Sequence, residues 1–192
     1  VCLASPLRDV YKRQVQKDAY AWLEQAAREV NQVWNHANAA TFKAWHGRYG
    51  GKQKWLSAFD VNPLFAGCGE VFEKIGIDTA QSVVAEHAVR RGQFKKSKLN
   101  WRKSGGSRRS LGWVPFKAPN LRFKVNKKDP SKIKVAFLGK SLRLFQANRL
   151  LDVYRLAQQG VGKLRAGNFS QDAVGDWYLN VVIDRVELQL AP

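Results

Sequence analysis

The chain has 192 residues, with 33 Lys and Arg against 15 Asp and Glu, a formal net charge of +18. So much like charge repels itself in a compact fold, and a polyanionic partner is the natural way to neutralise it. An acidic membrane surface is less suitable, because there is no basic amphipathic helix with a broad apolar face and no lipidation signal. With 45% apolar residues and seven Trp, the chain can bury a sizeable core. No run approaches the roughly 20 apolar residues of a membrane span.

Cysteine and histidine spacing indicates neither a disulfide framework nor a metal centre. Cys2 and Cys68 are the two cysteines, so we expect a reducing, cytoplasmic setting. None of His36, His46 and His87 has a partner four residues on, and neither Gly-Gly pair, at 50–51 and 105–106, is followed by the Lys-Ser/Thr of a phosphate-binding loop. We therefore expect no metal and no cofactor.

The first fourteen residues, VCLASPLRDVYKRQ, resemble a translated sequencing-adapter tail, and the chain contains no Met. We expect residues 1–14 to be a non-native or disordered tail, with a genuine N-terminal arm as the alternative. No functional role is expected for them.

Residues 15–103 are predicted to form a helical region. From Lys17 to Trp45 the apolar residues step by three or four, which is typical of one buried helix face. Asn62 followed by Pro63 predicts an N-cap and the first turn of a short helix that runs through Phe72. A third helix is expected to begin at Asp78 and to bury Ala80, Val83, Val84, His87 and Ala88.

The excess charge is concentrated after this third helix. Residues 90–140 hold 17 of the 33 basic residues and one acid, Asp129. Residues 104–110, SGGSRRS, predict a flexible basic loop and a domain boundary. Two aromatic residues are interleaved with the cations. Stacking and packing remain equally open for Trp101, and packing is favoured for Phe94.

After Leu111 the apolar period changes to two, as in WVPFK (113–117), LRFKV (121–125) and IKVAF (133–137). Such alternation predicts strands with one cationic, solvated face. The stretch 150–156 is expected to be one helical excursion, and 163–169 and 177–186 further strands. The predicted fold class is therefore α+β, a helical bundle followed by an antiparallel β-barrel or sandwich over residues 111–192.

Lys and Arg neutralise phosphates and release counterions, and interleaved aromatic rings can stack on unpaired bases. We therefore predict that nucleic acid is contacted by Arg90, Arg91, Lys95, Lys96, Lys98, Trp101, Arg102, Lys103, Arg108, Arg109, Lys117, Arg122, Lys124, Lys127 and Lys128.

Acidic residues do not predict a catalytic site. Metal-dependent phosphodiester hydrolysis needs two or three converging carboxylates. Asp129 stands alone in a predicted turn, and Asp60 and Asp78 stand where helix caps belong. Of the later acids, Asp172 and Asp176 are expected in a hairpin loop. We expect no enzyme activity from this chain.

Five segments together resemble transposon-encoded TnpB (OrfB) proteins. They are REVNQVWNHA (28–37), TAQSVVAEHAVRRGQF (79–94), LGWVPFK (111–117), LGKSLRLFQ (138–146) and GNFSQDAVGDWYLNVVID (167–184). The last is the most specific, and the resemblance covers about residues 17–190.

TnpB proteins are RNA-guided DNA nucleases related to the type V CRISPR effectors. The resemblance implies a wedge β-barrel with a helical recognition insertion, and guide RNA and target DNA as partners. It also implies that the nuclease half, with its carboxylate triad and zinc ribbon, is absent, and that the first wedge strand is missing. Ile183-Asp184 resembles the family's first catalytic motif but lacks its flanking glycines, so we expect no catalysis by Asp184.

Two other classes stay open. One is a stand-alone RNA-binding protein of the ribosome-associated type. The other is a helix-turn-helix DNA regulator that reads bases with the helix from Asp78, although that helix is poor in Asn, Gln and Arg before Arg90. The sequence does not indicate an oligomeric state.

Overall fold

The computed structural model describes residues 8–47, 52–126, 128–129 and 132–185, and it combines helices with antiparallel strands. The chain divides into two compact units: a β unit, Val1–Ala21 with Phe116–Pro192, and a helical unit, Trp22–Pro115. It therefore passes between units just after the start of α1 and again within β2. The division does not fall in the 104–110 loop, where the sequence suggested it.

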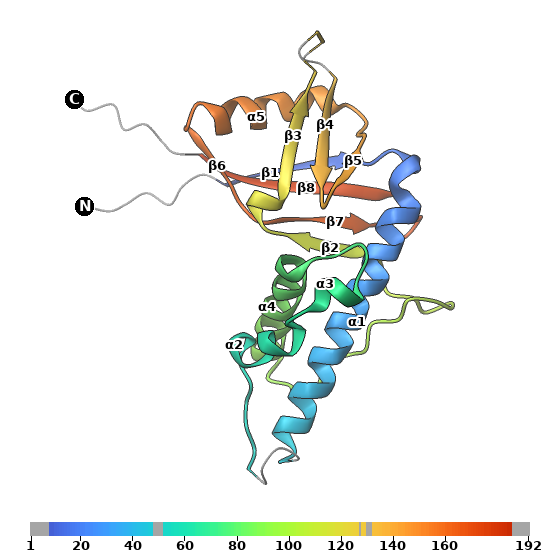
Figure 1. The fold of residues 1–192 in the computed structure, drawn as a ribbon, viewed down its shortest axis with the longest axis vertical. Helices are drawn as coiled ribbons and strands as arrows, with labels where there is room; N and C mark the ends of the chain where they lie inside the picture. Colours follow the sequence, from blue (N-terminus) through green and yellow to red (C-terminus); the bar gives the residue numbers. More distant parts are fainter. Residues whose placement is uncertain (1–7, 48–51, 127, 130–131, 186–192) are drawn as a thin grey trace, which may run out of the picture. The chain divides into compact units, whose positions relative to one another are not determined.

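The helical unit contains two long helices, α1 (Tyr20–Trp45) and α4 (Ile77–Phe94). A 3-10 turn, η1 (Lys17–Ala19), precedes α1. One side of α1 is buried along its whole length, from Leu23 to Ala44, as the apolar spacing predicted. Figure 1 shows both helices together with the short helices between them.

The predicted helix 62–72 is instead three short pieces, α2 (Ala58–Val61), η2 (Asn62–Phe65) and α3 (Cys68–Val71). The N-cap is Ser57 rather than Asn62, and it forms a capping box with Asp60. Gly67, at φ 76°, separates η2 from α3, because a left-handed backbone interrupts a right-handed helix.

The start of α4 also differs from the prediction by a residue or two. Its N-cap is Gly76, and Asp78 lies in the first turn. A carboxylate there stabilises the helix, because the N-terminal end of the helix dipole is positive. Lys95, at φ 49°, ends the helix in the left-handed region.

The β unit contains two antiparallel sheets (Figure 1). The larger sheet has the order β1-β8-β7-β2, and β6 also pairs with β8; the smaller has the order β3-β4-β5. The strands are β1 (Arg8–Gln14), β2 (Trp113–Phe116), β3 (Leu121–Val125), β4 (Ile133–Phe137), β5 (Lys140–Leu142), β6 (Gly162–Leu164), β7 (Gly167–Gln171) and β8 (Trp177–Arg185). The helical pieces are η3 (Ala118–Asn120), η4 (Ala147–Arg149) and α5 (Leu150–Gln158). The described strands form no closed barrel, which corrects that part of the predicted fold.

Residues 8–14 form the ordered strand β1, so the expectation of a disordered tail does not hold for them. β1 pairs with β8 without a break, from Arg8 opposite Asp184 to Gln14 opposite Tyr178. A further bridge joins Val15 to Leu144. That residues 1–14 are non-native stays a prediction, and residues 1–7 lie outside the described part of the chain.

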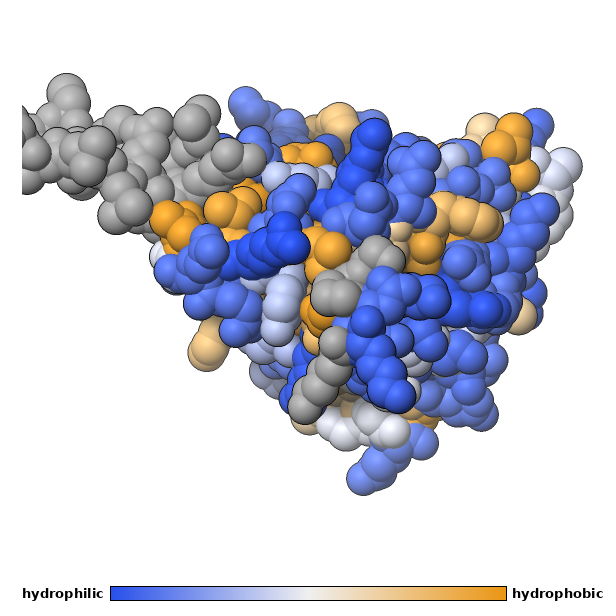
Figure 2. Space-filling model, turned by 90° about the horizontal axis from the view of Figure 1, so that it is seen from above, coloured by the Kyte–Doolittle hydropathy of each residue, from blue (hydrophilic) through white to orange (hydrophobic). Residues whose placement is uncertain are grey.

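Aromatic side chains fill the core of the β unit. The rings of Phe116, Phe137 and Phe169 lie 5.3–5.7 Å apart, centroid to centroid. Trp177, predicted as a core residue, is fully buried. Viewed from above, the surface is mostly hydrophilic, with apolar side chains in small separate groups (Figure 2). No helix in the described residues is both long and apolar enough to cross a membrane.

Candidate nucleic-acid interface

The basic segment, residues 95–110, has no regular secondary structure but is fixed along α1 by asparagine side chains. Asn38 Oδ1 accepts from the backbone N–H of Leu99 at 2.8 Å, and its Nδ2 donates to the carbonyl of Leu99 at 2.7 Å. Asn35 makes the same pair of hydrogen bonds with the backbone of Arg102, both at 2.8 Å. Each asparagine thus satisfies both backbone groups of one residue, as a neighbouring strand would.

Two more α1 residues extend this contact. Trp34 Nε1 donates to the carbonyl of Asn100 at 3.2 Å. Asn31 accepts from Arg102 Nε at 2.6 Å and donates to the hydroxyl of Ser104 at 3.1 Å. Asn31, Trp34 and Asn38 step by three and four positions, and Asn35 lies four positions after Asn31 and three before Asn38, so the contacting residues share one side of the helix.

The second part of the basic segment is a closed loop. Lys103 N–H donates to Ser110 Oγ at 3.0 Å, and Ser110 N–H donates to the carbonyl of Lys103 at 2.8 Å. Arg108 and Arg109 lie exposed within this loop. The loop predicted to be flexible is therefore tied together at its base.

Seven of the predicted cations in the helical unit are exposed, namely Arg90, Lys95, Lys96, Lys98, Lys103, Arg108 and Arg109. Arg90 Nε donates to Glu86 at 2.6 Å, an i,i+4 ion pair that partly neutralises it. Lys98 Nζ lies over the rings of Phe42, at 5.0 Å, and Trp101, at 5.4 Å. Their role in binding phosphate stays a prediction.

Two predicted contact residues, Arg91 and Arg102, make structural contacts. Arg91 is fully buried, stacks 4.1 Å above the ring of Trp55 and donates to the carbonyl of Leu56 at 3.0 Å. Arg102 is half-buried, and besides Asn31 its guanidinium reaches the carbonyl of Leu111 at 2.7 Å. Burial lowers the pKa of both guanidinium groups. Arg91 is therefore not placed to neutralise a phosphate on the surface, whereas the part of Arg102 that stays accessible faces a groove beside the basic segment.

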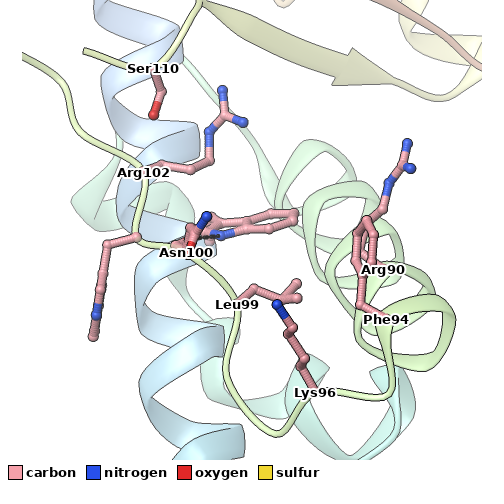
Figure 3. A pocket seen from close by; sticks show the side chains of 9 residues that line it. Arg90, Phe94, Lys96, Leu99, Asn100, Arg102 and Ser110 are labelled. Carbon is pink, nitrogen blue, oxygen red and sulfur yellow. Dashed lines mark hydrogen bonds between the residues drawn. The ribbon is translucent and has the colours of Figure 1, made fainter. Parts of the chain in front are cut away.

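An open groove of about 550 Å³ lies between the end of α4 and the basic segment (Figure 3). It is lined by Trp34, Arg90, Phe94, Lys96, Leu99, Asn100, Trp101, Arg102 and Ser110. Phe94 is 58% exposed and Trp101 46% exposed. The expectation that Phe94 packs into the core was wrong, because the residue is the last of α4 and lies past its buried face.

In the β unit, Arg122, Lys124 and Lys128 are exposed, whereas Lys117 is half-buried. The predicted contact residue Lys127 lies outside the described residues. Lys124 stands directly opposite Lys134 across β3 and β4, an unfavourable like-charge pair that a bound anion would relieve.

Sequence reasoning missed a second basic groove, of about 720 Å³, in the β unit. Its lining includes Lys132, Lys134 and Arg143, and the amides of Gln16, Gln146 and Asn148. Asp129 pairs with Lys132, and Asp18 with Arg143, both at 3.1 Å. The signal available in the sequence was the cationic alternation of IKVAF, which includes Lys134.

The acids of the most specific motif have structural partners. Asp172 Oδ1 accepts from the N–H groups of Val174 and Asp176 and shapes the β7–β8 turn, as the expected hairpin loop requires. Asp184 is buried and accepts from Arg8 at 3.0 Å and Arg165 at 2.5 Å. The hydrogen bond from Arg8, and after it the one from Arg165, lowers the pKa of Asp184. No group of three His, Cys, Asp or Glu in the described residues could hold a metal ion.

No protein-family model and no curated protein matches the chain. Among solved structures, it is similar to a cryo-EM structure of a Cas12f1–sgRNA–target DNA complex, with a TM-score of 0.49, 12% identity, and coverage of 88% of this chain and 43% of that one. A CRISPR–Cas12f ternary complex gives a TM-score of 0.48 at 13% identity, with 90% of this chain and 42% of that one covered. The chain thus spans less than half the length of either.

Proposed function

We propose that this chain binds nucleic acid through the exposed cations of residues 90–110. The observation that carries the proposal is that seven exposed cations lie on or beside a backbone clamped to α1 by Asn35 and Asn38. Cations neutralise phosphates without regard to base sequence. Because the backbone that carries most of them is already ordered, less conformational entropy is lost on binding.

The finer part of the proposal is that the partners are guide RNA and target DNA, bound by the wedge and recognition part of a TnpB-like protein. This part rests on the five sequence segments that resemble that family. A second support is that the polar residues of the 167–184 segment, the most specific of the five, bond to one another. Asn180 Nδ2 donates to Asn168 and Ser170 across β7 and β8, both at 2.9 Å, so these residues have a reason to occur together.

We further propose that the chain does not itself cut DNA. The support is that Asp184, the one carboxylate with a resemblance to a catalytic residue, is occupied by two arginines. Purified protein with Mg²⁺ and a structured RNA should leave DNA intact. Reproducible cutting by the purified protein would contradict this part.

The binding proposal is tested by neutralising three exposed lysines together, Lys95, Lys96 and Lys98, each to Gln. The matched control replaces three exposed lysines elsewhere, Lys17, Lys43 and Lys163, and so makes the same change in net charge. Both variants should fold, because surface substitutions usually change stability by under about 0.5 kcal/mol each. Affinity for structured RNA should fall about tenfold or more in the first variant and much less in the control. Equal losses would mean that net charge, not this segment, governs binding.

A further inference from the structure

The groove beside the basic segment places three aromatic rings, three cations and two uncharged polar side chains around one opening. Arg90 and Phe94 are one helical turn apart on α4, and both line the groove. The left-handed backbone at Lys95 then turns the chain, so that Lys96 lines the groove as well. In Figure 3, Arg90 and Phe94 stand on the α4 side, and Asn100 and Arg102 on the side of the basic segment.

Base-edge hydrogen bonds can be supplied by Asn100 and Ser110. The carbonyl of Asn100 is held by Trp34, and among the described residues its side-chain amide makes no hydrogen bond. Ser110 Oγ accepts from the N–H of Lys103, which leaves its hydroxyl able to donate. An amide offers both a donor and an acceptor, so the pair can meet the polar edge of a base without demanding one particular base.

We propose, as a refinement that rests on the proposed function, that this groove takes one unpaired nucleotide of a single-stranded nucleic acid. The base stacks on Phe94, its polar edge meets Asn100 and Ser110, and its phosphate is neutralised by Arg90 and Lys96. The groove volume of about 550 Å³ is sufficient for a group of this size. A base inside a duplex has both faces covered by its neighbours, so a paired strand cannot place a ring on Phe94.

The alternative explanation for the exposure of Phe94 is that it is a single apolar residue on the surface without a ligand, which is common in proteins. Phe94 differs from such a residue because cations from two segments, Arg90 and Lys96, line the same opening. Phe59 supplies the comparison: it is 86% exposed on α2 and lines none of the described grooves, so it controls for the loss of an exposed phenyl ring.

The test compares Phe94→Ala, Phe94→Tyr and Phe59→Ala against three probes: a single strand, an abasic sugar–phosphate chain of equal length, and the matching duplex. Phe94→Ala should weaken single-strand binding about 5- to 150-fold, as expected for the loss of one stacked base. Its affinity for the abasic chain and the duplex should change less than about twofold, because those probes use the cations alone. Phe94→Tyr should bind as the parent does, and Phe59→Ala should change nothing.

Equal weakening for all three probes would overturn the inference, since it would make Phe94 a general structural element. So would an unchanged single-strand affinity in Phe94→Ala. In both cases the salt-dependent binding of the parent protein would still stand, and the proposed function with it. If the parent binds none of the probes at low salt, the proposed function itself fails, and this inference fails with it.

Discussion

Asn38 pairs with the backbone of Leu99 as a neighbouring strand would, accepting from its N–H at 2.8 Å and donating to its carbonyl at 2.7 Å. Asn38 is fully buried, and Leu99 is 9% exposed. Water therefore cannot replace either hydrogen bond. The relationship explains how a segment without regular secondary structure presents its lysines from a fixed backbone.

Asn38→Ala should destabilise the protein by about 2–4 kcal/mol, because two buried backbone groups lose their partners. Urea titration followed by circular dichroism measures this loss. Gln32→Ala, an exposed substitution on the same helix, should stay within about 0.5 kcal/mol of the parent. RNA affinity should also fall in Asn38→Ala although the net charge is unchanged. An unaltered unfolding midpoint would show that the basic segment does not depend on this clamp.

His87 gives a pH dependence of stability. Burial, and after it the charge of Arg91, lowers the pKa of His87 to about 4. An unfolded histidine titrates near 6.5, so below that pH the unfolded state binds more protons and stability falls. The loss begins as the pH drops through about 6.5, is complete near 4, and is at most about 3 kcal/mol.

The measurement is the free energy of unfolding at pH 7.5, 5.5 and 4.5 for the parent and His87→Gln. Between about pH 6.5 and 4, the free energy of unfolding should fall less in the variant than in the parent, because the variant lacks the contribution of His87. Comparing the two proteins removes the contribution of the carboxylates, which titrate in both. Parallel stability curves would mean that the pKa of His87 is the same in the folded and unfolded states, so that burial does not lower it.

Gly167 should not tolerate a side chain. A Cβ at this position would meet the carbonyl oxygen of Asn180 and lie 2.6 Å from Cζ of Phe116. Gly167→Ala should therefore cost about 1–3 kcal/mol, the usual penalty for overpacking. Gly105→Ala is the control, because a Cβ there has open space and its backbone is not left-handed. Equal thermal melts of the two variants would contradict the close approach of β7, β8 and Phe116.

The sequence predicted α4 and its apolar face well, and the same spacing could have corrected the reading of Arg91. Ala80, Val84, His87 and Arg91 follow one another at intervals of three or four, so Arg91 continues the buried stripe. It was assigned to the surface because it stands in a run of cations. Stacking on Trp55 and a hydrogen bond to the carbonyl of Leu56 make its burial possible, and sequence spacing does not reveal such partners.

Alternation predicted most strands of the β unit, including β3, β4 and β8, but not how they pair. Two sheets and one closed barrel would bury the same residues. The alternation therefore does not distinguish them, because the difference lies in which strand edges pair. The likeness of residues 1–14 to an adapter tail hides strand β1, although β1 pairs with β8 along its whole length. The asparagine face of α1 was missed because polar residues on a helix are usually solvated, and only the fold brings Leu99 and Arg102 to them.

The most direct test of the account is the salt dependence of structured-RNA binding, measured for the parent, the Lys95, Lys96 and Lys98 to Gln variant, and the Lys17, Lys43 and Lys163 control. If the seven exposed cations of residues 90–110 meet phosphates, log K should fall against log salt with a slope of about −6, and affinity should drop about 10³–10⁵-fold between 50 and 200 mM. The first variant should have a slope shallower by about 3, and the control should keep the parent's slope. A flat response in the parent, or equal slopes in all three proteins, would contradict binding through this segment.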